Sequence, residues 1–136
     1  MSFITLDGLG NAKEPEVQPE GVYNLQLDNV EVKPSANNPE RTQVFHLYLS
    51  FPDLDDAKPF RSWVWAPTAS DPADRAKDYS LQIKRAFSAF GVQFDGDTFD
   101  PEDGIGQIAA NVTVGVEQDQ NGNDVNTVRY WPRLKD

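Results

Sequence analysis

The stretch "YSLQIKRAFSAFG" (residues 79–91) is where the spacing of the apolar residues changes to that of a helix. Its large apolar side chains recur every three or four positions, so they share one face of an amphipathic α-helix. These residues are Tyr79, Ile83, Phe87 and Phe90. Asp78 or Ser80 can cap the start of this helix, and Gly91 stands where a C′ glycine is expected.

Patterns typical of β-strands lie on both sides of this helix. Three precede it, in residues 21–33 ("GVYNLQLDNVEVK"), 41–51 ("RTQVFHLYLSF") and 60–66 ("FRSWVWA"). Two follow it, in residues 105–118 ("IGQIAANVTVGVEQ") and 124–132 ("DVNTVRYWP"). A change of register near Asp28 and Asn29 predicts a β-bulge in the first strand. The Asn-Gly pair at 121–122 predicts a hairpin between the last two strands. Alternation places one set of side chains of the fourth strand on a single face: Ile108, Ala110, Val112, Val114 and Val116.

The order of three strands, one helix and two strands is that of the OB-fold. This fold is a five-stranded, partly open Greek-key barrel. We therefore predict a mainly β, OB-fold-like barrel over residues 21–136, with one α-helix between strands 3 and 4. Residues 1–20 ("MSFITLDGLGNAKEPEVQPE") contain two prolines and little periodicity, which predicts a flexible N-terminal arm.

The distribution of charge matters more than its sum. Twelve basic and 22 acidic residues give a net charge of −10, which by itself argues against a nucleic-acid ligand. However, residues 92–124 contain eight acidic side chains and no basic one, whereas residues 58–91 contain six Lys or Arg against three Asp. The sequence thus combines an acidic body with a basic segment rich in aromatic residues.

The segment "RSWVWAP" (residues 61–67) lies within this basic region. Alternation places Arg61, Trp63 and Trp65 on one face of the third strand, opposite Phe60, Ser62 and Val64. In OB-folds the face of strands 2 and 3 binds oligonucleotides and oligosaccharides. Single-stranded nucleic acid requires aromatic rings for stacking and cations for phosphates. The candidate DNA-binding residues are Lys33, Arg41, His46, Tyr48, Arg61, Trp63, Trp65, Arg129 and Trp131.

Two conditions accompany this assignment. A period of two does not say which face is buried, so a core position for Trp63 and Trp65 is the alternative. Arg129 and Trp131 belong to the site if Val128 and Tyr130 point inward. The loop "QDQNGND" (residues 118–124) is acidic, so we expect a bound DNA strand to avoid this hairpin. It should run nearer the loop between the first two strands, "PSANNPE" (residues 34–40, the 1–2 loop).

Four features, taken in order along residues 21–132, resemble a family of small phage-encoded single-stranded-DNA-binding proteins with an OB-fold. They are a G-x-Y pattern in the first strand, a helix ending in "AFG", a glycine opening strand 4 and an N-x-V pattern in the last strand. The studied members of this family belong to replication and recombination modules. The resemblance implies a viral protein of phage DNA replication or recombination in the cytoplasm of an infected bacterial cell. It implies single-stranded DNA as partner, with phage replication or recombination proteins as further candidates.

Other classes of function find little support in the sequence. The chain has no cysteine, His46 is its single histidine and no nucleophile motif accompanies it, so we expect no enzyme, metal site or cofactor. No apolar run is long enough to span a membrane, so we expect no membrane partner. The main alternative is a phage structural or adaptor protein that uses the aromatic residues as a protein–protein interface. A carbohydrate-binding module is a third possibility.

Overall fold

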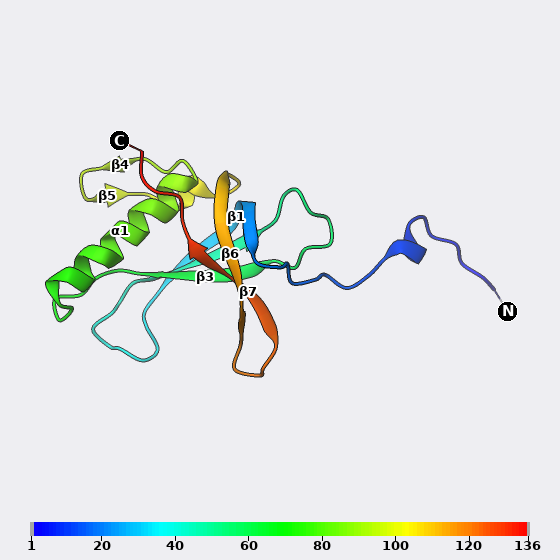
Figure 1. Cartoon of the computed structure of the whole chain (residues 1–136), viewed down its shortest axis with the longest axis horizontal. Helices are drawn as coiled ribbons and strands as arrows, with labels where there is room; N and C mark the ends of the chain where they lie inside the picture. The colour runs from blue at the N-terminus through cyan, green and yellow to red at the C-terminus, as the bar shows by residue number, and fades with distance from the viewer. Residues whose placement is uncertain (1, 136) are drawn as a thin grey trace.

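The long strand β1 (Gly21–Lys33) lies at the centre of a five-stranded sheet in the computed structural model, which describes residues 2–135 (Figure 1). The other strands of this sheet are β2 (Val44–Ser50), β3 (Phe60–Trp65), β6 (Ile108–Gln118) and β7 (Asp124–Tyr130). The strand order is β3-β2-β1-β6-β7, and every neighbouring pair is antiparallel. The sheet curls until β3 and β7 approach each other without sharing a ladder, so the barrel is nearly closed.

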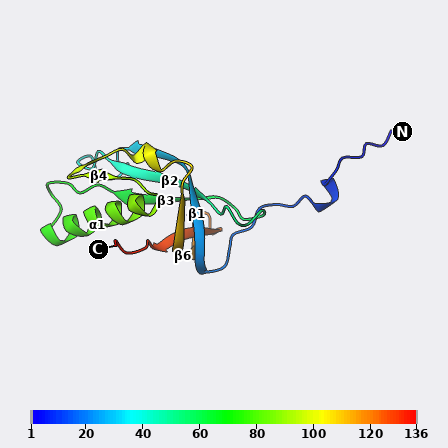
Figure 2. The ribbon, with the colours of Figure 1, turned by 90° about the horizontal axis from the view of Figure 1, so that it is seen from above.

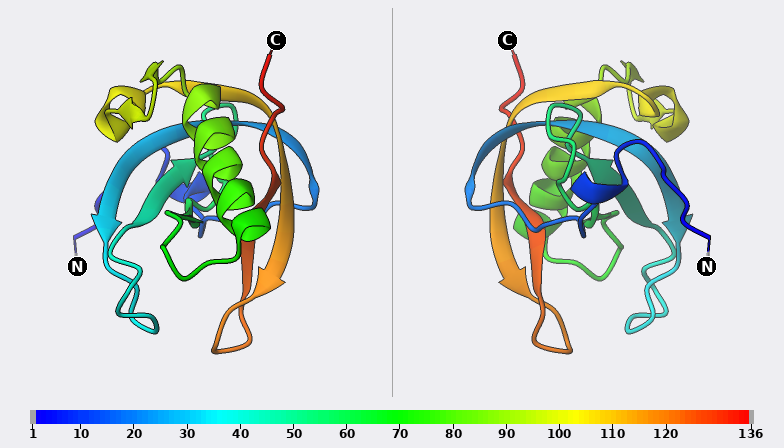
Figure 3. Two further views of the ribbon diagram at one scale, coloured as in Figure 1. Left: turned by 90° about the vertical axis from the view of Figure 1, so that its left-hand side faces the viewer. Right: turned by 90° about the vertical axis from the view of Figure 1, so that its right-hand side faces the viewer.

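A single α-helix, α1 (Ala73–Ala89), connects β3 to the second half of the sheet and lies across one end of the barrel (Figure 3). The smaller elements are η1 (Leu9–Asn11), β4 (Phe94–Asp95), β5 (Thr98–Phe99) and η2 (Pro101–Gly104). The predicted fold class, a mainly β barrel of five strands with one helix between barrel strands 3 and 4, is confirmed.

The core forms between the concave face of the sheet and α1. Six aliphatic side chains of β1, β2 and β6 are completely buried there: Leu25, Leu27, Leu47, Leu49, Val112 and Val114. Phe87 and Phe90 of α1 are also buried, and the Phe87 ring meets Phe45 of β2 edge-on at 5.4 Å. Burial of this apolar surface is the main force that holds the helix on the barrel.

The helix ends as predicted but begins earlier. Gly91 adopts a φ of 81°, and the amides of Gly91 and Val92 donate to the carbonyls of Ser88 and Phe87 at 3.0 Å each, which is a Schellman motif. The predicted start near Asp78 or Ser80 is wrong, because the helix begins at Ala73 after Pro72. Its first turns are polar and largely exposed, so no apolar spacing marks them.

Bulges decide which side chains of the strands face the core. The predicted bulge near Asp28 is confirmed by the shift in β1–β2 register between Leu27 and Asn29. A second bulge, in β6, was not predicted: Asn111 has a φ of 61° and the β1–β6 register shifts beside it. Consequently Ala109 is buried while Ile108 is 53% exposed, so the single inward face predicted for residues 108–116 is wrong.

The N-terminal residues divide into two parts. Residues 2–12 extend away from the barrel (Figures 1 and 2). Closer to β1 the chain contacts the domain: Lys13 pairs with Asp56 at 3.4 Å, and Glu16 forms a parallel bridge with Ala57. The amide of Gln18 donates to the side chain of Asn126 at 2.9 Å. Contacts with the domain therefore begin near residue 13, earlier than the predicted boundary at residue 20.

Candidate nucleic-acid interface

Strand β3 presents its tryptophans to solvent. Ser62 and Val64 are 7% and 5% exposed, whereas Trp63 and Trp65 are 54% and 47% exposed. The alternative in which both tryptophans are core residues is therefore excluded. The β2–β3 register places His46 opposite Trp63 and Tyr48 opposite Arg61. We call this set the aromatic face: His46, Tyr48, Arg61, Trp63 and Trp65.

Arg61 organises the middle of the aromatic face. Its guanidinium carbon lies 4.7 Å from the centroid of the Tyr48 ring and 6.0 Å from that of Trp63. Both distances allow a cation–π interaction. Among residues 2–135, Arg61 forms no ion pair with a carboxylate. Its positive charge is thus held between two rings and available to an external anion.

His46 contributes a ring rather than a charge. It meets Trp63 edge-on, with 5.9 Å between the ring centroids. Burial, together with the nearby charges of Lys33 and Arg61, lowers the pKa of His46. The imidazole is accordingly neutral at pH 7, and its buried Nδ1 has no hydrogen-bond partner among the described residues.

A carboxylate outside the predicted set of residues lies beside this face. Glu31 of β1 is the register partner of His46 and pairs with Lys33 at 3.0 Å. Hydrogen bonds from the Tyr48 hydroxyl and from Lys33 lower the pKa of Glu31, and the same contact raises the pKa of Tyr48. Lys33 is therefore partly neutralised. The signal was present in the sequence, since residues 31 and 33 share a face of one strand.

Arg41 is not a surface cation, so its assignment as a phosphate contact needs correction. It is 8% exposed, and its guanidinium donates to the Ala66 carbonyl at 2.6 Å and to the Asp71 carboxylate at 2.9 Å. The Thr68 amide and then Arg41 lower the pKa of Asp71 by hydrogen bonding. Arg41 thus ties the 1–2 loop to the segment between β3 and α1.

The guanidinium of Arg41, held by Asp71, also lies beside Trp65. The Arg41 guanidinium lies 5.8 Å from the Trp65 ring and 5.0 Å from that of Tyr79. Tyr79 of α1 meets Trp65 edge-on at 5.7 Å and 85°. Arg41 and Tyr79 therefore pack near the ring of Trp65, whereas the ring of Trp63 lies near His46 and Arg61.

A groove runs between the 1–2 loop and the tryptophans. It encloses about 590 Å³, within the usual range for ligand sites. One wall consists of residues 33–37, and the other includes Trp63 and Trp65. The groove brings together five of the predicted residues: Lys33, Arg41, His46, Trp63 and Trp65.

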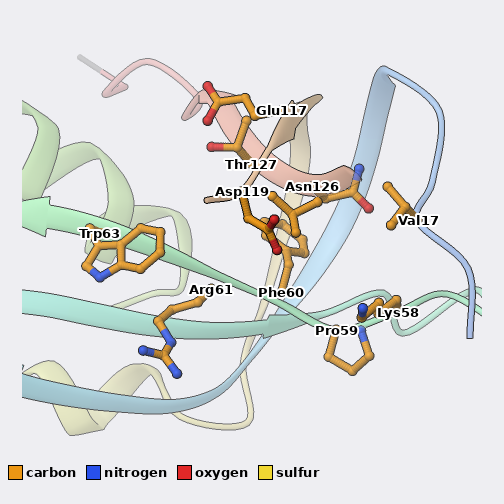
Figure 4. A pocket seen from close by; sticks show the side chains of 11 residues that line it. Val17, Lys58, Pro59, Phe60, Arg61, Trp63, Glu117, Asp119, Asn126 and Thr127 are labelled. Carbon is orange, nitrogen blue, oxygen red and sulfur yellow. The ribbon is translucent and has the colours of Figure 1, made fainter. Parts of the chain in front are cut away.

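A smaller pocket of about 200 Å³ occupies the seam where β3 and β7 fail to pair (Figure 4). Trp63 and Arg61 line it from β3, and Glu117 and Asp119 line it from the β6–β7 hairpin. Lys58 stands at its rim as a cation absent from the predicted set. Trp63 thus lines both the groove and the seam pocket. Glu117 and Asp119 of the acidic hairpin line the seam pocket together with Trp63.

The predicted residues of the last strand lie elsewhere. The β6–β7 register shifts at Arg129, so Tyr130 is 71% exposed while Trp131 is 7% exposed and packs on Phe90 at 5.6 Å. Trp131 is therefore a core residue, contrary to prediction. Arg129 lies over Gly115, with its Nε 3.7 Å from the Glu20 carboxylate, and it lines neither the groove nor the seam pocket.

Comparison with known proteins finds no family model that matches the chain and no similar sequence among curated proteins. Within residues 2–135, no helix has the length and apolar character needed to cross a bilayer.

Proposed function

We propose that the protein binds single-stranded DNA, largely without regard to sequence. The observation that carries this proposal is the exposure of Trp63 and Trp65 on the outer face of a barrel. Arg61, which forms no ion pair among residues 2–135, lies beside Trp63. Exposed rings next to a cation match the two requirements of single-strand binding, namely base stacking and phosphate neutralisation.

In this proposal, bases stack on Trp63 and Trp65, which lie on alternate positions of one strand. Arg61 contacts a phosphate, and Lys33 and Lys58 contribute weaker charge at either side. The strand follows the groove beside the 1–2 loop, because Glu117 and Asp119 would repel phosphates at the β6–β7 hairpin. Stacking is tolerant of sequence, since every base has a π-face.

The biological setting belongs to the same proposal and rests on the sequence resemblance alone. It is phage DNA replication or recombination in the cytoplasm of an infected bacterium. We propose no catalytic step, since the aromatic face offers stacking surfaces and cations but no pair of groups arranged for acid–base or nucleophilic chemistry.

A phage structural or adaptor protein is the second candidate. The seam pocket favours it, because its largely apolar walls include Phe60, Val17 and Val125 and adjoin the exposed Trp63. An apolar depression beside an exposed aromatic side chain is typical of protein–protein interfaces.

A titration with oligo-dT at several salt concentrations distinguishes the two candidates. For single-stranded DNA, the logarithm of the association constant falls linearly with the logarithm of the salt concentration, with a slope of about −0.7 for each phosphate neutralised. Two or three cations in contact with phosphates therefore predict a slope of roughly −1.4 to −2.1. Stacking should quench the emission of Trp63 and Trp65, while buried Trp131 supplies a constant background.

Arg61→Ala should make the slope about 0.7 shallower, because one phosphate contact is lost. Lys77→Ala is the matched control: Lys77 is exposed on α1, on the side of the helix away from Tyr79, and should leave the slope unchanged. Emission that does not respond to oligo-dT at low salt would reject DNA binding and favour the adaptor.

A further inference from the structure

A second groove, separate from the aromatic face, lies between α1, the start of β6 and the C-terminal segment. It encloses about 640 Å³. Four cations line it: Lys84, Arg85, Arg133 and Lys135. Its apolar surface includes Ile108 and Leu134, and Ile108 is exposed because of the bulge in β6.

The charges of this basic groove lack carboxylate partners within the described chain, although the Nζ of Lys84 lies 6.0 Å from the centroid of the Phe94 ring. None of the four cations forms an ion pair with a carboxylate of residues 2–135, and the Nε of Arg85 is buried without a hydrogen bond there. Four cations without an ion pair among residues 2–135 thus form a positive patch on a chain whose net charge is −10.

The lining also indicates the chemistry of the ligand. No aromatic residue lines the groove, so it offers no surface on which bases could stack. Aliphatic side chains between cations instead suit a peptide that carries both apolar side chains and carboxylates.

The N-terminal arm has this composition. Phe3, Ile4, Leu6 and Leu9 are between 59% and 88% exposed. Asp7 is exposed as well and forms no ion pair among the described residues. Four large apolar side chains on one short segment are unusual for a free surface and mark an interaction site.

The path of the arm decides which copy it reaches. Residues 2–12 leave the barrel at the end opposite to α1 and the C-terminal segment (Figures 1 and 2). The arm therefore points away from the basic groove of its own chain. We infer that the basic groove binds the arm of a second copy, so that copies associate head to tail. Such a heterologous contact continues from copy to copy unless the rotation closes a ring.

Sedimentation at increasing protein concentration, without DNA, tests this inference. The wild-type chain should form dimers and larger species. A chain lacking residues 2–12 should remain monomeric and folded, because contacts with the domain begin near Lys13. Lys84→Glu combined with Arg133→Glu should also give monomers, since both side chains are exposed and their reversal repels the arm. Arg75→Glu combined with Lys77→Glu makes the same charge change elsewhere on α1 and should leave association intact.

Mixing the two monomeric variants completes the test. The arm-deleted chain keeps its groove and the groove-reversed chain keeps its arm, so an equimolar mixture should form a 1:1 heterodimer and nothing larger. A labelled peptide of residues 2–16 should bind the arm-deleted chain and lose at least tenfold in affinity for the same chain carrying the groove reversal. A wild-type chain that stays monomeric, or variants that fail to complement, would overturn the inference without bearing on oligo-dT binding.

Discussion

Truncating Trp63 to alanine separates binding from stability. Trp63 is the more exposed of the two tryptophans, at 54%, and its ring neighbours on the aromatic face are His46 and Arg61. Loss of one stacked base costs about 1–3 kcal/mol, which is roughly a 5- to 150-fold weaker Kd for oligo-dT. Loss of a half-exposed side chain outside the core should cost less than about 1 kcal/mol of folding stability, so Tm should fall by less than about 4 °C.

Trp65→Ala should behave differently although it removes the same side chain. Trp65 packs edge-on against Tyr79 and lies near the Arg41 guanidinium, so its removal also loses an aromatic pair worth about 0.5–1.5 kcal/mol beyond its buried area. Both affinity and Tm should therefore fall. Tyr130→Ala removes an aromatic side chain that is 71% exposed on β7 and should change neither quantity.

Fluorescence titration with oligo-dT gives the Kd of each variant, and thermal unfolding of the same preparation gives its Tm. The reasoning fails if Trp63→Ala binds oligo-dT as tightly as the wild type. It also fails if Tyr130→Ala weakens binding as much as Trp63→Ala does, since exposure alone would then account for the effect.

Three further predictions concern the scaffold of the site. Trp131→Ala should lower stability by about 3–5 kcal/mol, measured by denaturant unfolding, because it leaves a cavity against Phe90; a folded variant of unchanged stability would contradict a core position. Gly91→Ala should cost about 1 kcal/mol in the same assay, because alanine is strained at a φ of 81°, and an unchanged midpoint would argue against the Schellman motif. Hydrogen bonding by the Thr68 amide and by Arg41 lowers the pKa of Asp71, so its stabilising effect is complete above the pKa of the unfolded chain and is lost as the pH falls toward the lower folded value. Asp71→Asn should therefore make Tm fall less steeply below about pH 4 than it does in the wild type. If the variant and the wild type lose Tm equally in acid, other carboxylates dominate the acid dependence of stability.

The local spacing of apolar residues was sufficient to predict much of this structure. Alternation in "FRSWVW" correctly separated Ser62 and Val64 from Trp63 and Trp65, and only the choice of the buried face remained open. The spacing of apolar residues and Gly91 located the end of α1, because both signals are properties of adjacent residues.

The errors arose where the outcome depends on residues far apart or on one extra residue in a strand. Arg41 was assigned as a free cation because its partner, Asp71, lies 30 positions later. Trp131 was assigned to the outer face because a period of two was continued through the β7 bulge at Arg129. A single added residue reverses every later side chain of a strand. The change of register near Asp28 was recognised in the sequence, whereas the bulges in β6 and β7 were not.

The central position of β1 also has a consequence for how the chain folds during synthesis. Its partner β2 follows after a short loop, but its other partner, β6, begins 75 positions after β1 ends. Until residues 108–118 leave the ribosome, one edge of β1 has no hydrogen-bonding partner, and open edges of this kind promote aggregation. Pairing two strands so far apart in the sequence is slow, because the intervening chain loses conformational entropy before the contacts between the strands stabilise it. We expect the β1–β6 pairing to limit the folding rate, and β1–β2–β3 to be the part of the nascent chain that most needs a chaperone.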